Sequence, residues 1–401
     1  MDVKVMDAES GVKASMPSPR RGWVNAPLNQ LPNKSDAIRN FSPSLYIAST
    51  CTGLIGILID VSPYLGRGWA VPTAWAFWWL SLLQFTGVTV MILLRVTRFW
   101  GSIASLPSSK SVDLFFFGAV AISVAILSEG FVRYMTHYFG SGFLVAGPAL
   151  WWATATITVL LNVALPFLAI QAHSRELPEV LPIWIVAFVP GVVTGSVGPI
   201  MASVLTDLSM ARHMIYMSYI LVGLSFPMVF IMLTIVVMRL LFHGGPSPPP
   251  LILSLFFPVA PLTLMGDALV ELAHGSIHAF PQDSLLNPFF NFAHPGLTSA
   301  LMAGGLFFFG AAVWWALFAA LAAVVVAARR RGLAYTVAWW GSVFPLGLLG
   351  LTALRLGTLL DVAALEVVGT VLSISTAVMW LTCSLMLAAR IWDGSNFARA
   401  L

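Results

Sequence analysis

The sequence predicts an all-α integral membrane protein with ten transmembrane helices, and two observations predict that class. Of the 401 residues, 59% are hydrophobic and only 9% are charged, whereas soluble domains carry roughly a quarter charged residues. Apolar runs long enough to cross ~30 Å of hydrocarbon recur along nearly the whole chain. A separate soluble domain therefore has little room. The basic residues behind the net charge of +4 are scattered over short loops, so they do not indicate a nucleic-acid partner.

The predicted spans follow one another with short loops, at residues 43–62, 74–95, 112–129, 146–171, 179–205, 213–239, 249–273, 297–328, 334–357 and 364–390. The eighth is longer than a bilayer needs, which predicts a tilted helix or one that begins outside the bilayer. Because the loops are short, consecutive spans should form five helical hairpins. We therefore expect one transmembrane domain over residues 41–392 and a short cytosolic tail over 393–401. Residues 1–40 read as a disordered cytosolic tail rich in Ser, Pro and charge, without the apolar core of a signal peptide.

Lys and Arg predict the orientation of these spans, because cytosolic loops carry an excess of positive charge. With the N-terminus inside, the cytosolic side holds sixteen basic residues and the outer side holds four. The outer four are Arg67, Arg133, Arg212 and Arg355. A wrong number of spans would scramble this asymmetry, so it supports ten spans with both termini in the cytosol.

Helix-breaking residues concentrate in the odd-numbered spans, as in STCTGLIG (49–56), VPGVVTGSVGP (189–199), FPVAPLTLMG (257–266) and WWGSVFPLGLLG (339–350). Pro and Gly free backbone groups that lipid cannot satisfy, so they are tolerated where a helix faces protein or a water-filled path. The alternation predicts an inner ring of kinked odd helices around a central pore, and an outer ring of straight even helices. The alternative is that these small residues serve close helix packing.

The predicted path suits a small anion. No ionisable group lies clearly at the middle of a span, which argues against tight proton coupling, whereas hydroxyls and oriented backbone dipoles favour an anion. Arg355 is the one outer-end cation on a predicted inner helix and is placed to attract anions. The alternative is an interfacial arginine that extends to the membrane surface or pairs with Asp361. Phe344 adjoins the helix-breaking Pro345, where its ring would plug a narrow path and open by turning aside. The alternative is ordinary core packing.

Two other features bear on different chemistry. His274 and His278 are four residues apart, a spacing that binds metal on a helix, and with His294 they support the hypothesis of a membrane enzyme. No third ligand lies at useful spacing and no nucleotide or nucleophile motif is evident, so we predict no metal, no cofactor and no enzymatic activity. Cys51 and Cys383 lie far apart in apolar segments, which predicts buried thiols rather than a disulfide.

Four segments together resemble the tellurite-resistance/dicarboxylate transporter family: FSPSLYIASTCTGLIGILI, LPIWIVAFVPGVVTGSVGPIMASVL, RLLFHGGPSPPPLILSLFFPVAPL and AWWGSVFPLG. That family includes bacterial tellurite-resistance proteins, plant slow-type anion channels, fungal malic acid transporters and sulfite efflux pumps. The resemblance covers about residues 40–395, and WWG followed by FPLG is most similar to the sulfite pumps. The chain departs from the family pattern at STCTGLIG, at VTGSVGP and at Asp267 of GDALVELA, which leaves the substrate open.

The resemblance implies ten helices around a central pore in each subunit of a homotrimer. The pore would be lined by odd helices and occluded by a phenylalanine of the ninth, which by position is Phe344. The other pore-lining candidates are Thr52, Gly53, Thr194, Gly195, Gly198, Pro258, Pro261, Gly341, Ser342, Pro345 and Arg355.

The implied function is export of a small, sulfite-like anion from a fungal cell across the plasma membrane. The inside-negative potential would drive it outward by ~2.3 kcal/mol per charge at 100 mV. The alternative is a carrier of C4-dicarboxylates or other organic acids, coupled to protons, with Asp267 as the titratable group in the path. Either way, a small anion and the lipid bilayer are the expected partners.

Overall fold

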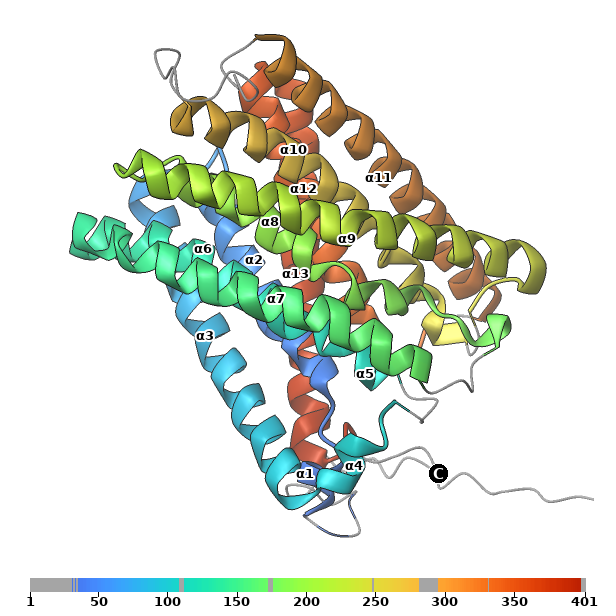
Figure 1. Ribbon diagram of the computed structural model, residues 1–401. Coiled ribbons are helices and arrows are strands. Elements are labelled where there is room, and N and C mark those ends of the chain that lie inside the picture. Colours follow the sequence, from blue (N-terminus) through green and yellow to red (C-terminus); the bar gives the residue numbers. More distant parts are fainter. Residues whose placement is uncertain are drawn as a thin grey trace, which may run out of the picture.

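Long helices make up almost all of the computed structural model (Figure 1), which describes residues 31, 33, 35–107, 112–171, 176–246, 249–280, 295–330 and 332–397. Within these ranges, nine helices are long and apolar enough to cross a membrane. The predicted fifth span is built differently. It consists of a 3-10 helix, η4 (Pro182–Ala187), followed by the 13-residue helix α8 (Pro190–Ala202). Each of these two segments begins with a proline, which the first turn of a helix tolerates because its N–H is not needed there.

The other long helices follow the predicted spans, although α2, α6, α10 and α12 begin later than predicted. They are α2 (Tyr46–Val61), α3 (Arg67–Arg98), α6 (Gly118–Phe139), α7 (Ala146–Gln171), α9 (Leu208–His243), α10 (Val259–Ala279), α11 (Pro295–Arg330), α12 (Trp340–Leu360) and α13 (Ala363–Asp393). Shorter helices are α1 (Asp36–Arg39), α4 (Trp100–Ala104) and α5 (Asp113–Phe116). The remaining 3-10 segments are η1 (Pro43–Leu45), η2 (Ser141–Leu144), η3 (Leu177–Glu179), η5 (Pro249–Phe256) and η6 (Val337–Trp339).

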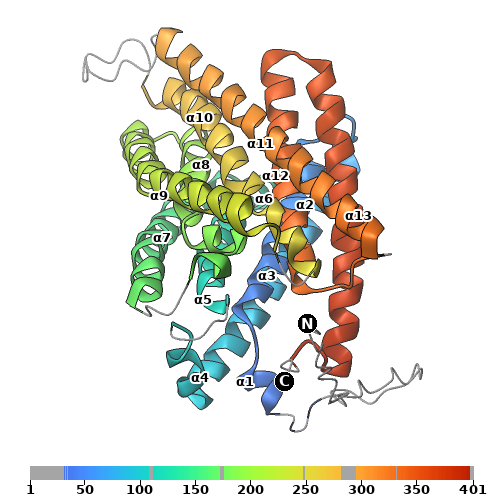
Figure 2. The ribbon, with the colours of Figure 1, turned by 90° about the vertical axis from the view of Figure 1, so that its right-hand side faces the viewer.

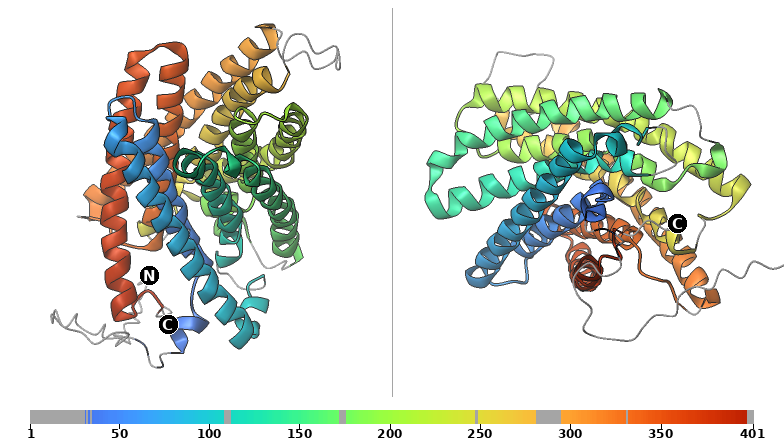
Figure 3. Two further views of the ribbon diagram at one scale, coloured as in Figure 1. Left: turned by 90° about the vertical axis from the view of Figure 1, so that its left-hand side faces the viewer. Right: turned by 90° about the horizontal axis from the view of Figure 1, so that it is seen from below.

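Burial divides the long helices into two sets. In α2 and α10, 89% and 94% of the most apolar window is buried, against 17% in both α3 and α13. The buried set, called the inner helices below, comprises α2, α6, α8, α10 and α12. The outer helices are α3, α7, α9, α11 and α13, which lie at the margin when the molecule is seen from below (Figure 3, right). The division follows the predicted alternation between odd and even spans.

The inner helices pack against one another in a closed cycle, from α2 to α6, α8, α10, α12 and back to α2. Each also packs against the outer helix that follows it in the chain. The cycle leaves one central axis that is surrounded by inner helices.

The irregular sequence lies mainly where the inner helices begin. The 3-10 segments η1, η4, η5 and η6 directly precede α2, α8, α10 and α12, and the single turn α5 precedes α6. In contrast to the predicted break at mid-span, α12 runs continuously from Trp340 to Leu360, with Pro345 in its second turn. Proline there removes one backbone hydrogen bond, to the carbonyl of Gly341.

The two ends of the described chain meet at one end of the molecule (Figure 2). The side-chain amide of Asn40 donates to the carbonyl of Phe397 at 3.0 Å, and the rings of Phe41 and Phe397 stack with centroids 5.8 Å apart. Buried Arg95, near the end of α3, donates to the Phe41 carbonyl at this same end. We call it the termini end.

Candidate functional site

A small cavity of about 30 Å³ lies on the central axis. All five inner helices or the segments that precede them contribute to its wall, and no outer helix does. The lining residues are Ile47, Thr50, Ala119, Ile122, Ile185, Val186, Val189, Phe257, Ala260, Trp340 and Phe344. A cavity needs roughly 10–15 Å³ to hold one water, so this one is too small for a hydrated anion.

The cavity lies at the first turns of the inner helices. Ile47, Ala119 and Ala260 each occupy the second position of their helix, in α2, α6 and α10. Val189 is the N-cap residue of α8, and Trp340 is the first residue of α12. Five helix N-termini therefore surround one small space. Each N-terminus carries the positive end of a helix dipole, equivalent to roughly half an elementary charge.

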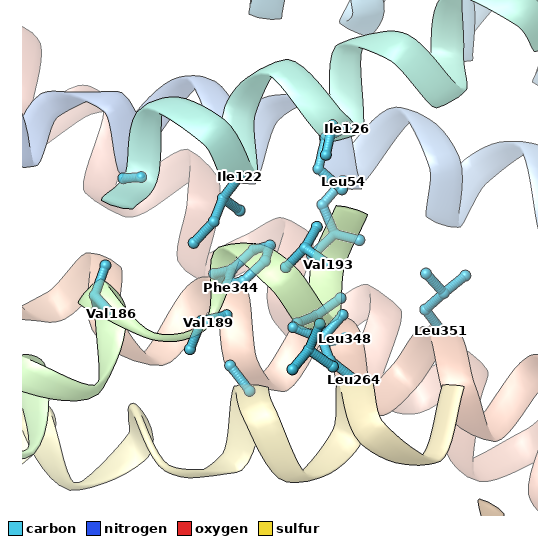
Figure 4. Packing of buried hydrophobic residues seen from close by; sticks show 14 of the residues in the cluster. Leu54, Ile122, Ile126, Val186, Val189, Val193, Leu264, Phe344, Leu348 and Leu351 are labelled. Carbon is cyan, nitrogen blue, oxygen red and sulfur yellow. The ribbon is translucent and has the colours of Figure 1, made fainter. Parts of the chain in front are cut away.

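Phe344 closes this space from α12. Its side chain is 8% exposed and lies among apolar side chains of the other inner helices (Figure 4). Ile122 of α6 lies on one side, and Val189 and Val193 lie on another. One turn further along α12, Leu348 packs near Leu264 of α10. Beyond the cavity the axis is thus filled by branched apolar side chains.

Several of the small residues predicted to line the path face away from the axis. Thr50 lines the cavity, and its hydroxyl lies 2.6 Å from that of Ser123. Thr52, two residues on, is turned about 200° around the helix. It donates to Gln84 of α3 at 2.8 Å and accepts from the Trp380 indole of α13 at 2.9 Å. Thr52, which is the predicted pore-lining candidate, therefore faces the outer helices, and Thr50 faces the cavity.

The same displacement by two residues holds for α8. Val189 and Val193 face the axis, whereas Gly195 and Gly198 face outer helices. A Cβ added at Gly195 would lie 2.7 Å from Cγ2 of Val222, and one at Gly198 would meet Trp151 at 2.6 Å. The Thr194 hydroxyl lies 2.8 Å from that of Thr158 on α7. These small residues let α8 approach α7 and α9 closely. They therefore fit the alternative given above, that small residues serve close helix packing.

The remaining small candidates lie at contacts between helices or at helix starts. A Cβ at Gly53 would lie 2.7 Å from Ile126 and 3.1 Å from the Ser81 hydroxyl, where α2 meets α6 and α3. Gly341 packs against Phe257, and buried Ser342 donates to the Trp339 carbonyl at 2.7 Å. Pro258 caps α10, Pro261 lies in its first turn, and Pro345 lies in the second turn of α12; the last two are buried.

Arg355 lies far from the cavity, in a network of charges near the ends of the inner helices. Its guanidinium donates to both carboxylate oxygens of Asp267 at 2.8 Å and to Glu129 at 3.2 Å, and it lies 3.3 Å from Glu271. Its side chain is 12% exposed. The predicted pairing with Asp361 is wrong. Six residues along a helix turn the side chain by about 240° beyond one full turn, and Asp361 is exposed at the C-cap of α12.

The network continues through α6 to α2. Arg133 donates to Glu129 at 3.0 Å and to Asp60 at 3.1 Å, and exposed Arg67 bonds Asp60 at 3.0 Å. The four carboxylates, Asp60, Glu129, Asp267 and Glu271, outnumber the three guanidinium groups. Beside this network of charges, an open cavity of about 240 Å³ is lined by Arg355, Glu271 and His274, among others. Buried charges that are paired in this way hold helices in register, because an unpaired buried charge is costly.

The alternative sites drawn from the sequence do not assemble within the described residues. No group of three or more His, Cys, Asp or Glu in these residues is placed to hold a metal ion. A ring nitrogen of His278 lies 2.9 Å from the Leu205 carbonyl, and His294 lies outside the described residues. The prediction for the cysteines is confirmed, since Cys51 and Cys383 are both buried and free.

Sequence reasoning missed the residues that form the wall of the cavity, apart from Phe344. A periodic signal was present: Ile47, Thr50 and Leu54 recur at helical spacing, as do Trp340, Phe344 and Leu348. Residues at spacings of three and four share one helix face. In helices that are apolar all round, however, this stripe does not stand out from its neighbours.

Comparison with known proteins finds one family and several similar transporters. A family model described as a voltage-dependent anion channel matches residues 40–388. Sulfite efflux pump SSU1 of Arthroderma otae and of Trichophyton rubrum are each 24% identical over 349 residues, which is 86% of this chain and 89% of theirs. An uncharacterized transporter of Methanocaldococcus jannaschii is 23% identical over 320 residues, covering 79% of this chain and 83% of its own.

Proposed function

The chain belongs to the voltage-dependent anion channel family, and on that premise we propose that it exports a small, sulfite-like anion through a central pore that Phe344 occludes. The observation that carries this proposal is the convergence of five helix N-termini around one apolar cavity. In a site shielded from water, these dipole ends favour a negative charge without any fixed cation. A cation would meet the same field as a barrier.

Phe344 is the proposed gate. The cavity at its ring is too small for a hydrated anion, and the surrounding side chains are apolar. Hydrophobic constrictions of this kind block ions, because an ion must shed its water to enter. In the proposed open state the Phe344 ring turns out of the axis and widens the path at the cavity.

The proposed topology has ten crossings in five hairpins, with both termini in the cytosol. The meeting of Asn40 and Phe397 at the termini end supports an even number of crossings. We assign the fifth crossing to η4 and α8 together, which span residues 182–202. The inside-negative potential then drives an anion outward by ~2.3 kcal/mol per charge at 100 mV, so no coupling ion is needed.

Sulfite is the proposed substrate because the relatives from Arthroderma otae and Trichophyton rubrum are named as sulfite efflux pumps. The test is flux into or out of proteoliposomes at a clamped potential, with sulfite, malate, nitrate and chloride in turn. The proposal expects sulfite to move fastest, in the direction set by the potential and without a pH gradient. Equal rates for empty liposomes and proteoliposomes would refute it.

A second candidate is a proton-coupled carrier of C4-dicarboxylates or other organic acids. Buried Asp267 and the partly exposed Glu271 beside Arg355 favour it, since ionisable groups inside transporters commonly carry protons. It predicts malate transport that requires a pH gradient and is lost in Asp267→Asn. Malate transport in the same assay without sulfite transport would favour this carrier over the exporter.

A further inference from the structure

A second cavity, of about 410 Å³, lies between the outer helices α3 and α13 and faces the side of the molecule. We propose that this groove binds one acyl chain of a membrane phospholipid, packed against Trp340, with the lipid phosphate beside Arg98. This site lies outside the central pore and is independent of the substrate.

Three stripes at helical spacing form the walls of the groove. On α3 they are Gln84, Gly87, Val88 and Met91, and on α13 they are Ser384, Leu387, Ala388 and Ile391. Phe41, Leu45 and Ala48 form the third wall, along the start of α2, and Trp340 lies at the bottom. Spacings of three and four place the set on α3 and the set on α13 each on one helix face. Small residues at Gly87, Ala388 and Ala48 leave the space that a chain would fill.

The groove is closed at one end and open at the other. At the closed end, the rings of Phe77 and Trp380 are 5.2 Å apart, and Thr52 is hydrogen-bonded to both Gln84 and Trp380. From there α3 and α13 diverge toward the termini end (Figure 3, left). The groove thus runs from the middle of the two helices to the level of Phe41 and Ile391.

Its surroundings favour a lipid chain as the occupant. Only 17% of the most apolar window is buried in α3 and in α13, so the rest of these helices faces hydrocarbon in a membrane. Val90, Leu381 and Leu385 on the same two helices are about half exposed or more. The lining is apolar except for Gln84 and Ser384, and the Gln84 carbonyl oxygen already accepts from Thr52.

Charge at the open end is complementary to a phosphate. Arg98 lies seven residues after Met91, so it continues the same face of α3, and it is exposed. Arg390 adjoins Ile391 on α13, with its guanidinium 5.2 Å from the Tyr335 ring centroid. Arginines at the membrane surface attract lipid phosphates. A phospholipid that places its chain in the groove therefore places its phosphate near positive charge.

Trp340 connects the groove to the central cavity. It is 2% exposed and lines both spaces, and its indole N–H donates to the Tyr335 hydroxyl at 3.1 Å. A chain in the groove would press on one side of this ring while the other side faces the cavity below Phe344. Lipid occupancy would therefore fix part of the wall of the central cavity.

The test is photolabelling of the full chain in proteoliposomes with a phosphatidylcholine that carries a diazirine in its acyl chain. After illumination, labelled residues are mapped by mass spectrometry. We expect label on Trp340 and Leu387, which bulk lipid does not reach because both are buried, as well as on exposed Leu385. Label on Leu385 without label on Trp340 or Leu387 would overturn the proposal.

Gly87→Leu fills the groove without a clash, since nothing lies within 4 Å of a Cβ added at Gly87. It should remove the label from Trp340 and Leu387 and leave that on Leu385. Gly223→Leu, at an equally open position on α9, is the matched control and should keep all three. Unchanged labelling in Gly87→Leu would contradict the proposal. Labelling of the groove that falls as the protein-to-lipid ratio rises would also contradict it, because a second copy of the chain would then cover the groove. Because labelling requires no transport, its outcome is separate from that of the proposed function.

Discussion

At the scale of single residues, Arg355 is the centre of the charge network at the end of the molecule opposite the termini end. Its guanidinium contacts carboxylates on α6 and α10 while its backbone belongs to α12. Three inner helices are therefore joined through one side chain. The sequence predicted a cation at an outer mouth that attracts anions, but the surrounding carboxylates compensate its charge. Its role in this structure is to hold helices together.

Arg355→Gln should lower the free energy of unfolding by about 3–5 kcal/mol, because it leaves buried carboxylates without a partner. The measurement is the midpoint of thermal or denaturant unfolding in micelles. The control is Arg67→Gln in the same network, where the arginine side chain is 67% exposed and the expected loss is about 0–1 kcal/mol. Equal losses in the two variants would show that Arg355 is not a structural centre.

At this scale, side-chain size directed the sequence analysis to one residue of the cavity wall, whereas helix rotation turns several other candidates away from the axis. Phe344 was singled out because a bulky ring beside proline is conspicuous, and it does line the central cavity. Thr52, Thr194 and Gly195 were chosen as small or polar residues in irregular helices. They face outer helices instead, because small residues allow close helix packing and large apolar ones fill the axis.

At the scale of helices, α2 offers a direct test of which face lines the path. Thr50 lines the cavity, whereas Thr52 is fully buried and hydrogen-bonded to α3 and α13. In a Phe344→Ala background with both native cysteines replaced by alanine, Thr50→Cys should react with a small water-soluble thiosulfonate. Thr52→Cys should not react, because its face never meets water. Anion flux before and after addition of the reagent measures the reaction of each variant. Modification of the position-52 thiol alone would reverse the assignment of the two helix faces.

The contact between α8 and α9 gives a second test at this scale. Gly195→Ala brings a Cβ to 2.7 Å from Val222 and 3.0 Å from the Ser218 carbonyl. Overpacking of this kind costs about 1–3 kcal/mol, so the yield of folded protein and its unfolding midpoint should both fall. Gly310→Ala on α11, where nothing lies within 4 Å, should instead stabilise by about 0.5–1 kcal/mol. A stable Gly195→Ala variant would mean that α8 is not held tightly against α9.

At the scale of the whole molecule, the sequence predicted the class and the alternation of helices better than it predicted the sites. Hydrophobic length identified the helices, and irregular Gly and Pro motifs marked four of the five buried helices, the exception being α6, which has no proline. The closed cycle of inner helices and the grouping of their first turns did not follow from the sequence, since both depend on contacts between segments far apart in the chain. The 3-10 segments place those turns around one cavity. Their only local signal in the sequence is the proline that begins η1, η4 and η5.

The central claim is that Phe344 gates an anion path through the ring of inner helices. The most direct measurement is current across a planar bilayer under a chloride gradient for wild type and Phe344→Ala, with reversal potentials. Phe307→Ala, a phenylalanine 70% exposed on α11, is the matched control. The account predicts that Phe344→Ala raises the current about tenfold or more, which corresponds to ~1.4 kcal/mol off the barrier, with a reversal potential that stays close to that of the anion. A Phe344→Ala variant that folds but conducts no more than Phe307→Ala, or that passes cations equally well, would contradict it.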